Sequence, residues 1–532
     1  MPQKNTFFIS TPIYYTNGVP HIGHSYSSII ADTLARYQKI SGKRVKFSTW
    51  VDENSQKIVE SAQKEGKEIM SYLDEMATKH RQVWDGLKLE YTDFIRTTEA
   101  RHHTLVQKVL QASFDNWDIY QGVYEGKYCV GCEAFKKDDD LIERDGILVC
   151  PDHLTAPQVL KEKNYFFRLS KYQKALEEYY ETHPDFVVPS ERYNEVKAFV
   201  SRWLEDFSIS RETNKFGIPL PFDPSHVTYV WYDALFNYVT VCQNGDEDFW
   251  PADVHVVGKD IIRFHAIYWP AMLLSAGYEL PKHILTTGYF TVDGQKISKS
   301  LGNVIDPVEF SETYNKDLLV LYMLSAFNIG QDGDFDQKQA ILTYNAKLAN
   351  NLGNLVNRVV VLALKLTENS GVLEPHLHAK PHPKPLLKER EQDVNDWQKI
   401  TSLLPEEKIV WDLMRKVQSN YKNFNLKWVL DTCFEYLDSL NKFADETQPW
   451  QMIKTDETAT REVLYTLAEG LRQVGLALYP FFPEKMSEMF VKLGLKEYKE
   501  ELEAGKLEEL LQRKEMFVIL EKWEALFQRM EL

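Results

Sequence analysis

Apolar residues follow two different spacings in the first part of the chain. The runs at Thr6–Ser10 and 45–51 are short and rich in β-branched and aromatic residues, which predicts strands. Segments 25–40 and 56–65 repeat apolar residues at helical spacing, which predicts helices. Strands that alternate with helices form a parallel sheet with helices on its faces. We therefore predict an α/β domain here.

The pattern changes near residue 116 and changes back near residue 225. The intervening stretch contains cysteine pairs, an acidic turn at 138–140 and an amphipathic helical pattern at 171–182. Runs typical of sheet strands return at 227–231 and 254–258. We interpret the stretch as an insertion that splits a Rossmann-like nucleotide-binding domain into two halves. The predicted segments are 1–115 for the first half, 116–224 for the insertion and 225–285 for the second half.

The remainder of the chain is helical in pattern from about residue 344 onward. The exception is 371–385, which is rich in proline and histidine and predicts an exposed loop between two helices. We therefore predict an all-α helical bundle over 346–532, joined to the sheet domain by a connecting region at 286–345.

Composition restricts the class of protein. The 532 residues are enough for three or four domains. The chain has no apolar run close to the ~18–20 residues that span a bilayer, and its N-terminus lacks the pattern of a signal peptide. Five cysteines, an odd and small number, are poor disulfide material. We expect a cytoplasmic protein without a membrane partner, although an organellar protein whose presequence has been removed would look the same.

The formal net charge of −16 argues against generic binding to polyanions, because bulk nucleic-acid affinity comes from Lys and Arg. The net charge does not exclude a nucleic acid that the protein recognises through one local basic face and through stacking on splayed bases. The case for such a partner therefore depends on motifs.

His21 and His24 lie in a turn between the strand at Thr6–Ser10 and the helix at 25–40. A strand, a glycine-bearing turn and a helix N-terminus form an anion site, because backbone N–H groups and the helix dipole face the ligand. The two imidazoles can reach phosphate oxygens, and Gly23 lets a purine ring approach the backbone. Alone, this His-x-Gly-His sequence could also be an ordinary loop.

A second polar motif follows Gly294 much later in the chain. Its two ammonium groups and two hydroxyl groups suit the stabilisation of charge that develops on a polyphosphate during transfer. The residues are Lys296, Ser298, Lys299 and Ser300. Together, in this order, the two motifs favour the functional interpretation over that of two unrelated loops.

The insertion contains two pairs of residues with the spacing of metal ligands. Two short hairpins that face each other suit tetrahedral zinc, and four protein ligands leave no open position for substrate. We predict one structural zinc ion with a Cys3His ligand set, against the alternative that the cysteines are small buried apolar residues. The predicted ligands are Cys129, Cys132, Cys150 and His153.

Asp52 ends the predicted second strand, where open parallel sheets bind their ligands. A carboxylate there can hold a substrate ammonium group, although its position equally suits an N-cap for the following helix. Two further segments are aromatic: 229–238, and a predicted helix in which Ile261, His265 and Trp269 share one face at i, i+4, i+8. Stripes of this kind are more often core than ligand pocket.

These motifs carry a resemblance to a known family. The pair at 21–24 and 296–300 resembles the signature of class I aminoacyl-tRNA synthetases. The runs Tyr-Val-Trp-Tyr-Asp-Ala at 229–234, Gly-Lys-Asp-Ile at 258–261 and Phe-His-Ala-Ile-Tyr-Trp-Pro-Ala at 264–271 narrow it to the methionyl-tRNA synthetases. The likeness extends over the whole chain, and its zinc knuckle is that of the bacterial or organellar type with a single knuckle.

The resemblance implies roles for individual residues. Asp52 would hold the methionine α-amino group, and His21 and His24 would act in catalysis with Lys296 and Lys299. Gly23, Gly258, Asp260, Ser298 and Ser300 would bind ATP. The methionine side chain would contact Ile13, Tyr15, Trp231, Ala234, Leu235, Tyr238, Ile261, His265 and Trp269. A thioether is polarizable and gains from aromatic edges, which agrees with this lining.

In the helical region, the residues that match the family's anticodon readers are Asn354, Arg358, Pro449 and Trp450. An amide and a guanidinium one helical turn apart can read a base edge, and an exposed tryptophan can stack a base. Without the resemblance, the same residues would be a solvated helix face and a helix start. The implied partners are ATP with Mg²⁺, L-methionine and tRNA(Met) with a CAU anticodon, and 286–345 would contact the tRNA stem.

The resemblance thus implies that methionine is activated by ATP to methionyl-adenylate and then transferred to the terminal adenosine of tRNA. The alternatives within the class fit less well. Synthetases for leucine, valine or isoleucine usually carry a larger insertion, and a synthetase for cysteine would need a zinc ion at the substrate thiolate, whereas the predicted ligands here all lie inside the insertion. Another alternative is a catalytically inactive relative that binds tRNA or another protein. The retained His21, His24, Lys296 and Lys299 argue against it.

The chain departs from the family's motifs at two positions. Asn54 and Ser55 stand where the family often has His-Gly, and Ile297 stands where it has Met. The Ile is a volume-conserving apolar change, whereas Asn54 could alter a phosphate or pocket contact. The chain ends after one helical domain, without the C-terminal fold that some relatives use to dimerise, so we expect a monomer.

Overall fold

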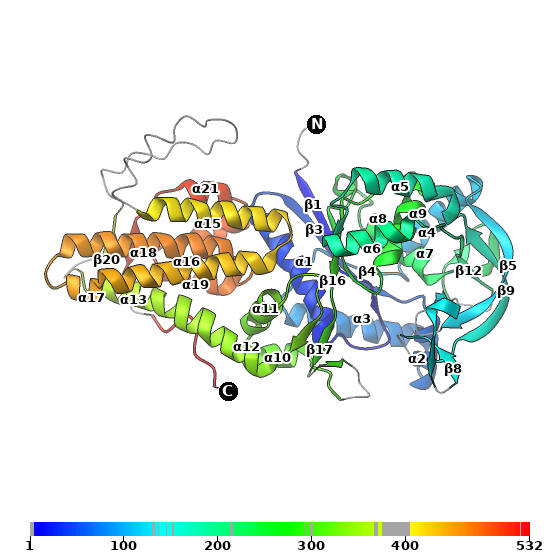
Figure 1. Ribbon diagram of the computed structural model, residues 1–532, viewed down its shortest axis with the longest axis horizontal. Coiled ribbons are helices and arrows are strands. Elements are labelled where there is room, and N and C mark those ends of the chain that lie inside the picture. The colour runs from blue at the N-terminus through cyan, green and yellow to red at the C-terminus, as the bar shows by residue number, and fades with distance from the viewer. Residues whose placement is uncertain are drawn as a thin grey trace.

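The computed structural model describes residues 5–129, 134–136, 138–144, 146–151, 154–212, 216–292, 294–297, 302–366, 371–374, 405–521 and 523–531. Figure 1 shows a sheet domain in the centre, a helical domain at one end of the long axis, and the curved β5–β9 pair at the other end. The fold is the predicted one in outline: a parallel α/β domain followed by a helical region.

The central sheet is parallel throughout its described strands, in the order β10-β16-β15-β1-β3-β2, with β4 also paired to β3. Side chains alternate between its two faces. Phe7 and Ile9 point into one apolar core, whereas Phe8 points into the other. The strands are β1 Thr6–Ser10, β2 Tyr14–Tyr15, β3 Arg44–Asp52, β4 Asp93–Arg96, β10 Val187–Val188, β15 Val254–Gly258 and β16 His283–Thr287.

Helices cover both faces of this sheet, as expected of parallel strands that are apolar on both sides. α1 begins at Ile22, three residues before its predicted start, because His21 caps it. The helices that the first half contributes are α1 Ile22–Ile40, α2 Gln56–Lys64, α3 Ile69–Gly86 and α4 Ala100–Asp115.

The stretch 116–224 is built on a long antiparallel pair, in which Ile119 lies opposite Phe167. It also sends β10 back into the central sheet, beside β16. Its other elements are β5 Ile119–Cys129, β6 Ala134–Lys136, β7 Ile142–Arg144, β8 Ile147–Val149, β9 Gln158–Phe167, α5 Gln173–Thr182, α6 Ser190–Val200, β11 Phe207–Ser208, β12 Ser210–Arg211 and β13 Pro219–Leu220.

The predicted sheet strand at 227–231 is wrong beyond Thr228. Strand β14 (Asp223–Thr228) pairs antiparallel with β12 and β13, outside the central sheet. The Tyr229 carbonyl then accepts the N–H of Tyr232 at 2.9 Å, so the chain turns into α7 (Val230–Leu235), followed by α8 (Asn237–Thr240). All six side chains of α7 are buried, and a short apolar run of this kind fits a buried helix as well as a strand.

A small sheet and two helices connect the halves of the molecule. Their bounds are β17 Phe290–Val292, β18 Gln295–Lys296, β19 Gly333–Phe335, α10 Pro307–Tyr314 and α11 Lys316–Ser325. The rod that follows consists of α12 (Gln337–Tyr344), a π-helix (Asn345–Gly353) and α13 (Asn354–Ala363), which continue one another in Figure 1.

The helical domain also contains a two-stranded ribbon, which corrects the prediction of an all-α domain and of a loop from residue 371. Gly371–Leu373 forms β20 and pairs with β21 (Phe517–Ile519) near the end of the chain, a partner too distant for local sequence to reveal. Residues 375–385 lie outside the described ranges. The remaining helices are α15 Pro405–Lys422, α16 Leu426–Thr447, α17 Pro449–Met452, α18 Glu457–Leu478, α19 Pro483–Lys492, α20 Tyr498–Glu503 and α21 Leu507–Gln512.

The helical domain packs directly on α1 and the turn after it. The Tyr37 ring stacks on the Tyr421 ring with centroids 3.7 Å apart and planes 4° apart. At the end of α1, a Cβ on Gly505 would lie 2.6 Å from the Gly42 Cα, so these two backbones touch. One apolar core runs from the sheet through α1 into the helical domain.

Candidate active site

The histidine turn forms an unusual helix cap. Nδ1 of His21 accepts the Gly23 N–H at 3.1 Å, and Nδ1 of His24 accepts the His21 N–H at 3.1 Å. Because Nδ1 accepts in both rings, their neutral forms carry the proton on Nε2, a donor suited to a phosphate oxygen. Burial, with the nearby His21 and His80 rings, lowers the pKa of His24 well below its usual value.

The two signature motifs meet in space. A Cβ on Gly23 would lie 3.1 Å from the His21 ring and 3.2 Å from Cδ1 of Ile297, the central apolar residue of the second motif. The Ile22 N–H donates to the Ile305 carbonyl at 3.1 Å, just beyond that motif. Lys296 ends β18, whereas Ser298, Lys299 and Ser300 lie outside the described residues.

Asp52 lies where the prediction put it, at the carboxyl end of β3, and is 1% exposed. Tyr15 lies beside it on β2, and the Thr16 hydroxyl donates to the Asp52 carbonyl at 3.3 Å. Because β1 and β3 are parallel, Asp52 lies at the same edge of the sheet as the chain that leaves β1 toward His21.

The predicted methionine residues come together in the apolar core on the other face of the sheet from α1. Trp231 stacks on Phe264 with centroids 3.8 Å apart and planes 1° apart. Segment Phe264–Tyr268 is a π-helix that runs into α9 (Trp269–Ala276), so the α-helical i, i+4, i+8 face is not what aligns these residues. The predicted side chains packed here are Ile13, Tyr15, Trp231, Ala234, Leu235, Tyr238, Ile261 and Trp269, with His265 against them.

His265 and Tyr238 form the polar end of this core. Nδ1 of His265 lies 3.0 Å from the Ile261 carbonyl, which can only accept, so Nδ1 carries the ring proton. Nε2 therefore accepts, and the Tyr238 hydroxyl donates to it at 2.9 Å. Burial lowers the pKa of His265 to about 4, which keeps the ring neutral near pH 7.

Gly258 ends β15, at the same edge of the sheet as Asp52. A Cβ there would lie 2.5 Å from Oδ1 of Asp260, so the Asp260 carboxylate folds over this glycine. The arrangement places a carboxylate at the strand end, which suits the hydroxyl groups of a ribose because a carboxylate accepts hydrogen bonds.

The predicted zinc ligands are only partly described. Cys129, at the end of β5, and Cys150, after β8, are both buried and pack in one small cluster with Leu141. Cys132 and His153 lie outside the described residues, and the described ones contain no group of three potential metal ligands. Each predicted pair thus contributes one thiol to the same place.

Arg358 and Trp450 lie together in the helical domain. The Arg358 guanidinium lies 5.8 Å from the centre of the Trp450 ring and bonds Asp445 at 3.1 Å. Trp450 is 36% exposed, Pro449 begins α17, and Asn354 is exposed one turn before Arg358. A cavity of about 330 Å³ is lined by Asn357, Arg358, Val361, Leu362, Asp445 and Trp450.

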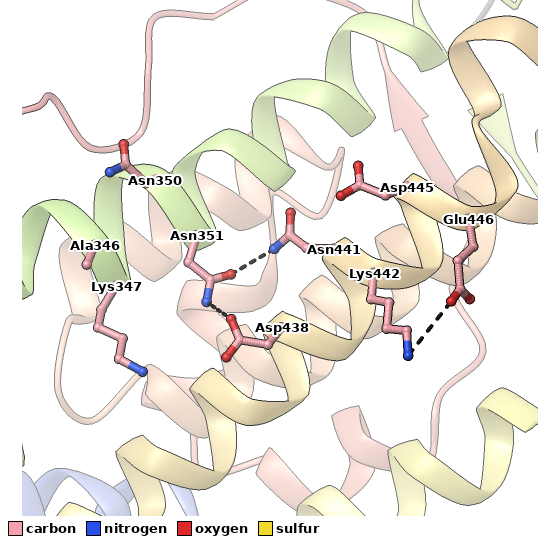
Figure 2. Close-up of a pocket in the computed structure, with 9 residues that line it drawn as sticks. All are labelled: Ala346, Lys347, Asn350, Asn351, Asp438, Asn441, Lys442, Asp445 and Glu446. Carbon is pink, nitrogen blue, oxygen red and sulfur yellow. Dashed lines mark hydrogen bonds and ion pairs between the residues drawn. The ribbon is translucent and has the colours of Figure 1, made fainter.

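A groove of about 680 Å³ adjoins this cavity and shares Asp445 with it. Figure 2 shows that its walls come from the π-helix and from α16. Asn351 donates to Asp438 at 2.7 Å and accepts from Asn441 at 2.7 Å. We did not predict these amides, whose only signal in the sequence is the asparagine-rich face of the first helix.

Sequence comparison identifies the class. Residues 7–360 match the family model described as tRNA synthetases class I (M). Together with the parallel sheet and the joined motifs, this match defines a class I tRNA synthetase.

More specific relatives agree. A methionine–tRNA ligase of Fusobacterium nucleatum is 40% identical, over 93% of this chain and 75% of that protein. One of Thermosynechococcus vestitus is 39% identical, over 92% of this chain and 90% of its own length. The structure of Mycobacterium tuberculosis methionyl-tRNA synthetase in complex with methionyl-adenylate superimposes with a TM-score of 0.87 at 31% identity, over 98% of this chain and 100% of that one. The chain belongs to the methionine–tRNA ligase family.

Within the described residues, no helix has the length and apolar character needed to cross a membrane.

His80, behind His24, gives the site a testable pH response. It is 1% exposed, and burial lowers its pKa to about 4. Between about pH 6.5 and 4, His80 is therefore protonated in the unfolded chain and neutral in the folded chain. The free energy of unfolding falls as pH falls through this window, by about 1.4 kcal/mol per pH unit. We expect His80→Leu to lose less of its melting temperature than wild type between pH 7.5 and pH 5. The exposed His183→Leu is the control, and an equal loss in His80→Leu and wild type would contradict the prediction.

Proposed function

We propose that this chain is a methionine–tRNA ligase, which activates methionine with ATP to methionyl-adenylate and transfers the methionyl group to the 3′-terminal adenosine of tRNA(Met). The observation that carries the proposal is the meeting of the two signature motifs, in a fold whose β3 ends at the buried Asp52. The relatives and the solved structure described above support it.

The chemistry needs no covalent nucleophile on the protein. In the first step, the methionine carboxylate attacks the α-phosphorus of ATP in line, and pyrophosphate leaves. In the second, a ribose hydroxyl of the terminal adenosine attacks the methionyl carbonyl, and AMP leaves. Positioning and charge stabilisation are sufficient for such transfers. Mg²⁺ would bind the ATP phosphates and reduce their charge.

We assign the residues of the site as follows. Nε2–H of His21 and of His24 would donate to phosphate oxygens, and Lys296 and Lys299 would stabilise the leaving pyrophosphate with Ser298 and Ser300. Gly23, Gly258 and Asp260 would hold the nucleoside. Asp52 would pair with the α-ammonium group. The thioether would lie among Ile13, Tyr15, Trp231, Ala234, Leu235, Tyr238, Ile261, His265 and Trp269.

The hydrogen-bond directions add a detail to this pocket. The Tyr238 proton is committed to Nε2 of His265, so the hydroxyl presents an oxygen lone pair rather than a proton to its other neighbours. A sulfur atom tolerates this contact because it is polarizable and needs no donated proton, whereas a side chain that must accept a hydrogen bond from this hydroxyl would have to displace the Tyr238–His265 bond.

We further propose one structural zinc ion, held by Cys129, Cys132, Cys150 and His153. The buried cluster that joins Cys129 to Cys150 supports it, because thiolates from two hairpins match the preference of Zn²⁺ for a tetrahedral sulfur-rich site. The ion would stabilise the insertion and take no part in the reaction.

We also propose that Asn354, Arg358, Pro449 and Trp450 read the CAU anticodon. Arg358 and Trp450 line one cavity, which supports the proposal, whereas Asn354 and Pro449 are not part of its lining. The enzyme would act as a monomer in the cytoplasm. The small number of cysteines suits a reducing compartment.

Methionine-dependent exchange of pyrophosphate into ATP tests the adenylation step. We expect exchange with methionine and none with leucine or isoleucine. Lys299→Ala should lower the rate by one to a few powers of ten with little change in the methionine KM, because pyrophosphate charge develops mainly in the transition state. Lys338→Ala, an exposed lysine on α12, should behave as wild type. A change confined to the methionine KM would mean that the loop belongs to the amino-acid pocket.

Trp450→Ala should weaken tRNA charging while exchange stays normal. Stacking on an unpaired base is worth about 1–3 kcal/mol, so kcat/KM for tRNA should fall by about 5- to 150-fold. Trp428→Ala removes another exposed tryptophan of the same domain and should leave charging unchanged. Normal charging by a folded Trp450→Ala would show that Trp450 stacks on no base, and a joint loss of exchange and melting temperature would make it a packing residue.

Elemental analysis tests the metal. Protein purified without chelator should contain about one zinc per chain, and Cys150→Ala should lose it and melt at a lower temperature, because metal affinity contributes to folding. Cys433→Ala, a buried cysteine of the helical domain, should keep its zinc. Wild-type protein free of zinc would rule out the metal.

A further inference from the structure

Asn54 follows β3 directly and stands where the related motif often has a histidine. Its side chain is 3% exposed, between the buried carboxyl groups of Asp52 and Asp233. The sequence left open whether this residue alters a phosphate contact or a pocket contact, and its hydrogen bonds favour the pocket.

Every N–H group of Asn54 donates to an acceptor that cannot donate in return. The backbone N–H bonds Oδ1 of Asp52 at 3.2 Å. The side-chain Nδ2 bonds Oδ2 of Asp233 at 3.0 Å and the Thr97 carbonyl at 3.4 Å. Because a carboxylate and a carbonyl need donors, these contacts fix the orientation of the amide.

These bonds tie together three elements that surround the site. Asp52 ends β3, Thr97 follows β4, and Asp233 lies in α7. α7 also carries Trp231 and Ala234, which the proposed function places around the methionine side chain. Asn54 therefore links the carboxylate assigned to the ammonium group with the helix assigned to the thioether.

The carboxylate of Glu53, the residue before Asn54, is held differently from that of Asp233. Glu53 is fully buried and pairs with the Arg96 guanidinium at 2.8 Å, and it also accepts from the Thr98 hydroxyl. Asp233 instead accepts a hydrogen bond from the neutral amide of Asn54. A neutral donor orients Asp233 without bringing to it a positive charge that would repel a substrate ammonium nearby.

We propose that Asn54 is a positioning residue for methionine, which sets the distance between Asp52 and α7 through its bridge to Asp233. This inference rests on the proposed function. Its loss should weaken methionine binding and leave the chemical step and ATP binding nearly unchanged, because none of its bonds reaches the phosphate turn.

The sharpest variant is Asn54→Asp, which keeps the shape and replaces the donor by a carboxylate. At pH 8 this group faces Asp233 as a like charge. We expect the methionine KM in pyrophosphate exchange to rise by about 10- to 100-fold, the range for a lost bond to a charged group, with little change in kcat or in the ATP KM. At pH 6 two facing carboxylates share a proton more readily, which restores a donor between them. The ratio of the variant KM to the wild-type KM should therefore fall.

Asn54→Ser serves as a second variant in case the first does not fold. It keeps the backbone bond to Asp52 and loses the amide, so its methionine KM should rise at both pH values without recovery. Asn345→Asp is the matched control. Asn345 is another buried asparagine, which donates to the Met530 carbonyl at 2.8 Å in the helical domain, and its replacement should leave the methionine KM unchanged.

Three results would overturn the proposal: a wild-type methionine KM in Asn54→Ser, a loss of kcat with unchanged KM, or a raised KM in Asn54→Asp that does not recover at pH 6. Melting temperatures on the same samples separate these results from unfolding. Absence of methionine-dependent exchange in the wild-type enzyme would instead refute the proposed function, whatever the variants do.

Discussion

Helix α1 determines where both halves of the molecule lie. Fourteen of its nineteen residues are buried. One side packs on the parallel sheet, and the other forms part of the core that continues into the helical domain. Within it, Arg36 is 6% exposed and pairs with Asp32 at 2.8 Å, while Arg36 Nη2 donates to the Lys88 carbonyl at 2.8 Å. Removal of one partner of such a buried pair would leave an uncompensated charge, so the position of α1 is strongly constrained.

The same helix orients the chemistry at its N-terminus. The phosphate turn is part of the helix, because His21 and His24 supply its cap, and the backbone N–H of Ile22 reaches past the second motif to Ile305. Low pKa values keep the buried His24 and His265 neutral. Under the proposed function, imidazoles and amides orient the substrates, and the positive charge that stabilises departing phosphate comes from the lysine loop.

Local sequence predicted an element correctly where the residues of that element alone determine its structure. The strands at Thr6–Ser10 and Val254–Gly258 have the predicted bounds, because apolar β-branched runs between turns have few alternatives. The segment at 227–231 failed because its apolar run satisfies a buried helix equally well. The candidate site was predicted largely through motif resemblance. The contacts that complete it were not predictable, because Asn54 and Asp233 are 179 residues apart and the Phe264 stack requires the fold to exist first.

The backbone contact between Gly42 and Gly505 also affects how a large substrate could be recognised. Both residues have left-handed φ angles, of 87° and 79°, and no side chain separates the chains they belong to. At this point the sheet domain and the helical domain therefore pack main chain against main chain. Under the proposed function, a tRNA that reaches the histidine turn and the cavity at Trp450 together would have to match the span that this packing sets between them.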